Sequence, residues 1–165
     1  EFRRVLFRSN ALRPPGRGAS LSRSATMTDD RVEQVLEAAR RLVAAFARND
    51  AEAYFAAFSE DASFIFHNWP QPLRSRAAYR ELWERWRRED GFEVLACESS
   101  NTCVSLQGDL AIFSHDVATR LRLQGTESLN RERETILFRL EQQEGRWLAC
   151  HEHLSAMPEY LPSTS

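Results

Sequence analysis

Three ionisable residues on predicted strands are the best candidates for chemistry in this chain: His115, Glu134 and Glu152. One imidazole that faces two carboxyl groups is a plausible acid–base set, because a neighbouring carboxylate raises the basicity of a histidine. A carboxyl group in an apolar wall keeps its proton to a higher pH. The alternative is an internal polar cluster that fixes the sheet register, or a pairing of glutamate with arginine. These residues favour proton transfer as the chemistry, and they leave open whether a reaction occurs.

Alternation along the strands predicts that these three side chains face the interior. In a strand, residues i and i+2 point to the same side. Around His115 the same-side residues, such as Phe113, are mainly bulky and apolar, and Glu134 shares its side with Ile136. On the last strand the same rule turns Glu152 inward. Its predicted outward set is Trp147, Ala149, His151, His153 and Ser155.

The pair His151 and His153 raises the question of a metal site. Two histidines at i and i+2 on one strand can bind a metal from one side, but a complete site needs at least a third ligand. The outward face of the preceding strand offers arginines instead, among them Arg131 and Arg133, which repel a cation. No metal is therefore expected. No phosphate-binding loop or nucleophile motif is present either, so no cofactor is expected.

Composition narrows the classes of protein that this chain can be. It has 165 residues and a net charge of -2, with 22 basic residues that are all Arg. No apolar run is long enough for a membrane span. The body of the chain beyond the Arg-rich N-terminal stretch is acidic, which argues against nucleic-acid binding. Three cysteines in no zinc-binding pattern predict free thiols and a cytoplasmic location.

Residues 1–26 are expected to lie outside the domain. They are rich in Arg, Ser and Pro and have no sustained apolar period. This composition fits an artefact or tag, a targeting segment or a native disordered tail. Met27 is then the natural start, the domain covers residues 27–158, and residues 159–165 form a tail.

Three predicted helices precede a predicted antiparallel meander. Thr28 or Asp29 is expected to cap the first helix, and Ser75 the third. The second helix is expected at 51–58 and a first strand at 62–67. After Gly91 the pattern predicts long strands joined by short turns, at 92–106 (interrupted near Ser99–Asn101), 110–123, 129–140 and 146–155. This order indicates an α+β fold with helices on one face of a mainly antiparallel sheet.

The order of these elements, together with Arg133-Glu134-Thr135 and Gly-Arg-Trp…His-Glu-His-Leu-Ser near the C-terminus, resembles the nuclear transport factor 2-like superfamily. Within it the chain is similar to SnoaL-like proteins, over roughly residues 29–158. The last motif also resembles the end of the calcium/calmodulin-dependent kinase II association domain. The resemblance implies a cone, in which a strongly curved sheet wraps helices around a pocket. It also implies dimerisation through the outer sheet face, with Trp147 and Leu137 as the apolar part of the interface.

The resemblance implies a small-molecule-binding domain for an apolar or polyketide-like ligand, in which His115, Glu134 and Glu152 would act in isomerisation, cyclisation or dehydration without a cofactor. The family's isomerase pattern of an inward Asp and Tyr cannot be placed here. His67 would lie near the pocket mouth, beside Trp69 in a loop with two prolines. Trp83 could wall the pocket or belong to the core. The predicted ligand contacts are His67, Trp69, Trp83, Phe113 and Ile136. The alternative function is a non-catalytic dimeric binding or assembly module.

Overall fold

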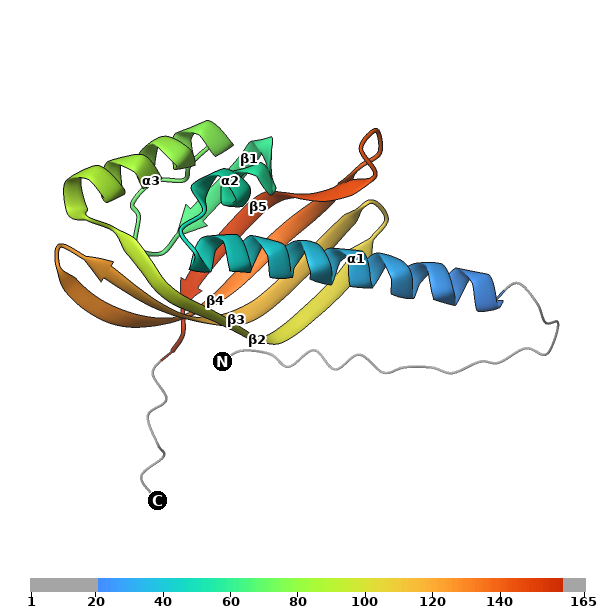
Figure 1. Cartoon of the computed structure of the whole chain (residues 1–165). Coiled ribbons are helices and arrows are strands. Elements are labelled where there is room, and N and C mark those ends of the chain that lie inside the picture. Colours follow the sequence, from blue (N-terminus) through green and yellow to red (C-terminus); the bar gives the residue numbers. More distant parts are fainter. Residues whose placement is uncertain (1–20, 159–165) are drawn as a thin grey trace, which may run out of the picture.

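The computed structural model describes residues 21–158, with side chains from Asp29 onward. Its elements are α1 (Leu21–Ala47), α2 (Ala51–Ala56), β1 (Phe58–Phe66), α3 (Arg76–Asp90), β2 (Glu93–Gln107), β3 (Leu110–Leu123), β4 (Thr126–Glu141) and β5 (Arg146–Ala156). Figure 1 shows α1 along the concave side of the sheet, and α2 and α3 beyond its β1–β5 end. The predicted α+β class and the meander after Gly91 are therefore confirmed.

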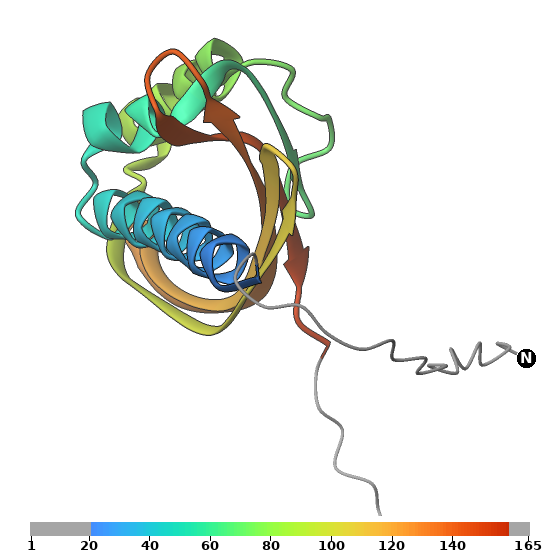
Figure 2. The ribbon, with the colours of Figure 1, turned by 90° about the vertical axis from the view of Figure 1, so that its right-hand side faces the viewer.

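The five strands form one sheet in the order β1-β5-β4-β3-β2. Neighbouring strands run antiparallel, except that β1 pairs with β5 in parallel. The sheet is strongly curved and curls around α1, as Figure 2 shows in a view along that helix. The curl leaves an interior space between the sheet and the helices, and the residues that face it decide what the protein can bind.

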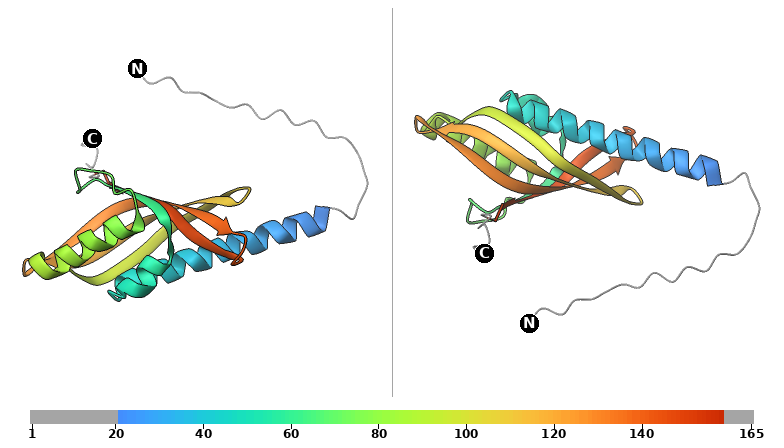
Figure 3. Two further views of the ribbon diagram at one scale, coloured as in Figure 1. Left: turned by 90° about the horizontal axis from the view of Figure 1, so that it is seen from above. Right: turned by 90° about the horizontal axis from the view of Figure 1, so that it is seen from below.

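The first helix begins earlier than the sequence predicts. It starts at Leu21, so the predicted cap at Thr28 or Asp29 is wrong. Its N-terminal part runs past the ends of the strands (Figure 3). Most of the segment predicted to lie outside the domain, residues 1–20, and the tail from 159 fall outside the described residues. Among helices of residues 21–158, none is long and apolar enough to cross a membrane.

Local side-chain contacts fix the ends of α1 and α3. Asn49 adopts a positive φ of 55° after α1, and its amide group exchanges two hydrogen bonds with the backbone of Val94 at 2.7 and 2.8 Å. The Ser75 hydroxyl accepts a hydrogen bond from the Ala78 amide at 3.1 Å, which confirms the predicted cap of α3. Gly91 ends α3 in the left-handed conformation, with φ 61°. These contacts hold both helices against the start of β2.

A bulge interrupts β2 at the position that the sequence predicts. The pairing of β2 with β3 shifts between Ser100 and Cys103, and Asn101 has a φ of 52°. Asparagine tolerates this left-handed conformation better than most residues. The bulge bends β2 beside His115 of the neighbouring strand.

A second bulge, in β5, corrects the predicted orientation of Trp147. Leu137 and Phe138 of β4 pair with His151 and Ala149, so Cys150 is an extra residue on β5. An extra residue breaks the alternation, so residues on its two sides no longer follow one inward–outward pattern. Trp147 therefore lies in the core, where it is 6 % exposed, and not on the outer face. Glu152 and His153, beyond the bulge, keep their predicted inward and outward orientations.

Candidate functional site

A pocket opens between the concave face of the sheet and the helices. Its cavity volume is about 100 Å³, and the free space reaches about 710 Å³ when the open solvent at its mouth is counted. Its polar lining comes mainly from β4 and β5, and its aromatic lining from the helices and the segments next to them. The lining residues are Leu42, Val43, Phe46, Tyr54, Phe66, Asn68, Trp86, Phe92, Cys97, Val117, Thr119, Leu121, Asn130, Glu132, Glu134, Glu152 and Leu154.

Glu152 lies in the pocket wall with few hydrogen-bond partners. It is 3 % exposed, and the hydroxyl of Tyr54 donates one long hydrogen bond of 3.4 Å to its Oε2. Burial, and then the neighbouring Glu134, raise the pKa of Glu152 well above its usual range. The side chain therefore keeps its proton to a higher pH than an exposed glutamate does.

Glu134 is held by a histidine on the adjacent strand. Register places Glu134 directly opposite His115, and Nε2 of the buried ring lies 2.5 Å from Oε2 of the Glu134 carboxyl group. The other ring nitrogen, Nδ1, lies 2.6 Å from the hydroxyl of Ser99 on β2. His115 does not itself line the pocket, since its 1 % exposed ring sits behind Glu134. Three adjacent strands thus form a hydrogen-bonded row that ends in the pocket.

A second histidine–carboxylate pair lies at the mouth. Nε2 of His67 is 2.5 Å from Oε1 of Glu132, whose side chain is 7 % exposed against 36 % for His67. His67 immediately follows β1, whereas the sequence predicts it as the last strand residue. Its backbone amide donates to the carbonyl of Leu154 at 3.2 Å, which fixes the turn at the edge of the pocket.

The structure separates the residues predicted as ligand contacts. Trp83 and Ile136 are fully buried core residues and do not line the pocket. Phe113 lines a second hollow, between α1 and β2, and packs against His115 with ring centroids 4.7 Å apart. Trp69 packs edge-on against Trp86 at 5.6 Å. None of the five predicted contacts is among the lining residues, and His67 lies between the lining residues Phe66 and Asn68.

Several lining residues were not identified from the sequence. Glu132 shares the inward side of β4 with Glu134, so the alternation that identified one should have included the other. Tyr54 gave no signal, because an aromatic residue on a short helix is most simply a core residue. The other missed polar residues are Asn68, Cys97, Thr119 and Asn130.

The pair His151 and His153 lies on the opposite face of β5 from Glu152. His151 is half-buried and receives a 2.8 Å contact from the hydroxyl of Ser63, while His153 is exposed. Within residues 29–158, no three His, Cys, Asp or Glu side chains gather in a way that could hold a metal ion.

Residues 35–159 match the family model of the SnoaL-like domain. The chain belongs to the SnoaL-like domain family. The match covers the inward-facing residues of all five strands, and therefore the whole pocket. No curated protein matches the chain.

Solved structures with similar folds include three proteins at low sequence identity. A nuclear transport factor 2-like protein of unknown function in nutrient uptake from Rhodospirillum rubrum is 18 % identical, with a TM-score of 0.65 over 75 % of this chain and 98 % of that one. A second nuclear transport factor 2-like protein, with a cystatin-like fold, from Novosphingobium aromaticivorans is 21 % identical, with a TM-score of 0.64. That match covers 85 % of this chain and 90 % of the other. A ketosteroid isomerase-like protein from Erwinia carotovora atroseptica is 20 % identical, with a TM-score of 0.64. That match covers 76 % of this chain and 95 % of the other. These likenesses establish the nuclear transport factor 2-like fold of the SnoaL-like chain.

Proposed function

We propose that this SnoaL-like protein binds a compact, largely apolar small molecule and moves a proton on it without a cofactor. The observation that carries the proposal is the meeting of a neutral carboxyl group, Glu152, and a histidine-paired carboxyl group, Glu134, in one aromatic-walled pocket. Two acids in different environments take different roles, one giving a proton and one receiving it.

The proposed chemistry is a proton transfer of the kind used in isomerisation, cyclisation or dehydration. Glu134, held by His115, would accept a proton from a carbon next to a carbonyl or hydroxyl group of the ligand. Glu152 would donate a hydrogen bond, and then its proton, to the oxygen that gains negative charge. Ser99 and His115 would position Glu134, because neither lines the pocket.

Ligand binding is tested by closing the pocket. A thermal-shift screen of compact metabolites should yield compounds that raise the melting temperature, since a ligand that binds the native state stabilises it. Leu121→Trp fills the pocket and should remove those shifts. Leu123→Trp, at an exposed position two residues along β3, is the matched control and should keep them. Shifts that survive Leu121→Trp would place binding elsewhere.

Proton transfer is tested separately from binding. Compounds that bind are incubated with the protein in D₂O, and deuterium entering at carbon is followed by NMR. Glu134→Gln should abolish exchange, and Glu152→Gln should slow it by about two orders of magnitude, the usual contribution of one acid–base group. Binding without any catalysed exchange would leave a binding protein and remove the catalytic part of the proposal.

We further propose a homodimer through the outer face of the sheet. One row across this face joins Ile112, Leu137, His151 and Ser63. Ile112 is 42 % exposed, and Ile65 on the next row is 39 % exposed. Ile112→Asp should shift sedimentation toward the monomer, whereas Leu129→Asp, at a 55 % exposed position near the start of β4, should not. A sedimentation coefficient unchanged by Ile112→Asp would exclude this interface.

A further inference from the structure

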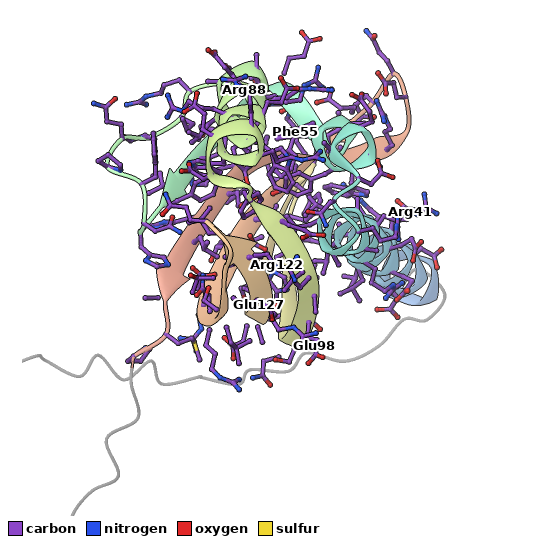
Figure 4. The ribbon with its side chains drawn as sticks, turned by 60° about the vertical axis from the view of Figure 1, so that its left-hand side comes forward. Arg41, Phe55, Arg88, Glu98, Arg122 and Glu127 are labelled. Carbon is purple, nitrogen blue, oxygen red and sulfur yellow. The ribbon has the colours of Figure 1, made fainter. Side chains whose placement is uncertain are left out.

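The pocket has an uneven distribution of charge. Three carboxyl groups line it, from Glu132, Glu134 and Glu152, and none of the lining residues is Arg or His. The arginines lie elsewhere. Arg41 on α1 and Arg88 on α3 point outward from the helices, and Arg122 pairs with Glu93 and Glu127 at 2.8 Å (Figure 4). An anionic ligand would therefore find no positively charged partner among the lining residues.

The wall opposite the carboxyl groups is aromatic. Phe46 comes from α1, Tyr54 from α2, Phe66 from β1, Trp86 from α3, and Phe92 from the segment before β2. A cation is attracted to the face of an aromatic ring, most strongly to Trp, and this attraction grows when water is excluded. The pocket thus offers an acidic wall and an aromatic wall to a single ligand.

The carboxyl group of Glu152 has two hydrogen-bonding neighbours. The hydroxyl of Tyr54 donates a long hydrogen bond of 3.4 Å to it, and Glu134 shares a side-chain hydrogen bond with it. Two carboxyl groups that share a hydrogen bond hold one proton between them, and a bound ammonium group can take the place of that proton.

We propose that the ligand of this pocket is an organic cation, a protonated amine on a compact apolar body. The ammonium group would sit between Glu152 and Glu134 on one side and the aromatic rings on the other. The inference rests on the small-molecule-binding part of the proposed function and narrows the ligand to one chemical class. The proton-transfer part needs a protonated Glu152 and therefore applies to an uncharged ligand.

The proposal predicts a proton linkage. The ionisable groups that face Glu152 are Tyr54 from α2, Tyr79 from α3, and Glu132 and Glu134 from β4, with His115 behind the last. Burial raises the pKa of Glu152, so it is neutral before binding. A bound cation favours the ionised form, so Glu152 releases a proton on binding, and affinity for the amine rises as pH increases toward neutrality.

Two matched ligand series test the charge directly. The first is benzylamine, benzyl alcohol and benzoate, and the second is 2-phenylethylamine, 2-phenylethanol and 3-phenylpropanoate. Calorimetry on the whole chain should show each amine binding at least about tenfold more tightly than its alcohol, since one cation–π contact and one charged hydrogen bond each contribute on that order. The carboxylates should not bind. Repeating the titration in two buffers of different ionisation enthalpy should reveal the released proton.

The outcomes separate the two proposals. An alcohol or carboxylate that binds as tightly as its amine would overturn the cation inference and leave the small-molecule function standing. Failure of every compound to bind would overturn the inference and count against the function as well. Glu152→Gln should lower the affinity for the amines at least about fivefold and abolish proton release. The affinity for the alcohols should stay within about twofold of the parent value. Glu81→Gln, on the exposed face of α3, is the control.

Discussion

The hydroxyl of Ser99 lies 2.6 Å from Nδ1 of His115, so an exposed residue of β2 contacts a histidine that is 1 % exposed. The bulge at Asn101 follows immediately on β2. Ser99 lines the hollow between α1 and β2, whereas Glu134, on the other side of the ring, lines the pocket. The row from Ser99 through His115 to Glu134 therefore joins two separate spaces on the concave side of the sheet.

Ser99→Ala should change the state of the His115 ring. Loss of the hydroxyl leaves Nδ1 without that partner, and a lost hydrogen bond of this kind costs about 1 kcal/mol. The measurement is a long-range ¹⁵N–¹H NMR spectrum, in which the two ring nitrogens report the tautomer. Ser100→Ala, at the next and exposed position, is the control. Identical His115 signals in the two variants would show that the Ser99 contact does not act on the ring.

Stability should fall with rising pH because of Glu152. Burial raises its pKa in the folded protein above the ordinary value of 4.5, so between these two values the folded state holds more protons than the unfolded state. Each pH unit in that window costs at most about 1.4 kcal/mol of unfolding free energy. Urea titrations of Glu152→Gln should show a shallower decline from mildly acidic to neutral pH. Equal slopes in the variant and the parent would mean that Glu152 ionises normally.

Cys97 should react slowly with alkylating agents. Burial raises the pKa of its thiol to about 11. At pH about 8 only on the order of a thousandth of it is then the reactive thiolate. Cys103, on the same strand and exposed, is the internal comparison. Mass spectrometry after iodoacetamide treatment should find Cys103 modified first, and an occupied pocket should slow Cys97 further. Modification of Cys97 at the rate of Cys103 would contradict its burial.

The Trp147→Ala variant should unfold more easily than the parent protein, and its oligomeric state should not change. The indole nitrogen donates to Gln34 at 3.2 Å, Arg31 lies over the ring at 5.2 Å, and the side chain is 6 % exposed. Removing a buried aromatic side chain costs about 3–5 kcal/mol. Leu129→Ala, at an exposed site, should change stability by less than about 0.5 kcal/mol. A stable but monomeric Trp147→Ala protein would restore the outer-face role that the sequence predicts.

Alternation was sufficient to orient His115 and Glu134, because β3 and β4 pair without interruption from Leu110 to Leu123. It was wrong for Trp147, since the bulge at Cys150 depends on pairing with β4 and β1 and leaves no local mark in the sequence. Glu152 was oriented correctly because it and Leu154, an apolar residue on the same side of the strand, both lie on the C-terminal side of that bulge.

The pocket itself was harder to predict than the strands. Its aromatic wall depends on how α2 and α3 pack across the curved sheet, and periodicity cannot distinguish a core aromatic residue from a lining one. Trp83 and Trp86 are three residues apart on α3, yet one is fully buried and the other lines the pocket. The early start of α1 at Leu21 was missed because residues 21–27 have no apolar face that would signal a helix.

The position of β5 in the sheet has a consequence for synthesis. It is the last strand to be made, yet it lies between β1 and β4. While the chain emerges from the ribosome, β1 has no strand partner until β5, about the last tenth of the described chain, has been made. Until then β4 also has an unpaired edge on the side that β5 will occupy. Unpaired edges are prone to join other chains. A ribosome that stalls before Arg146 would therefore release a chain with two exposed strand edges and an incomplete pocket.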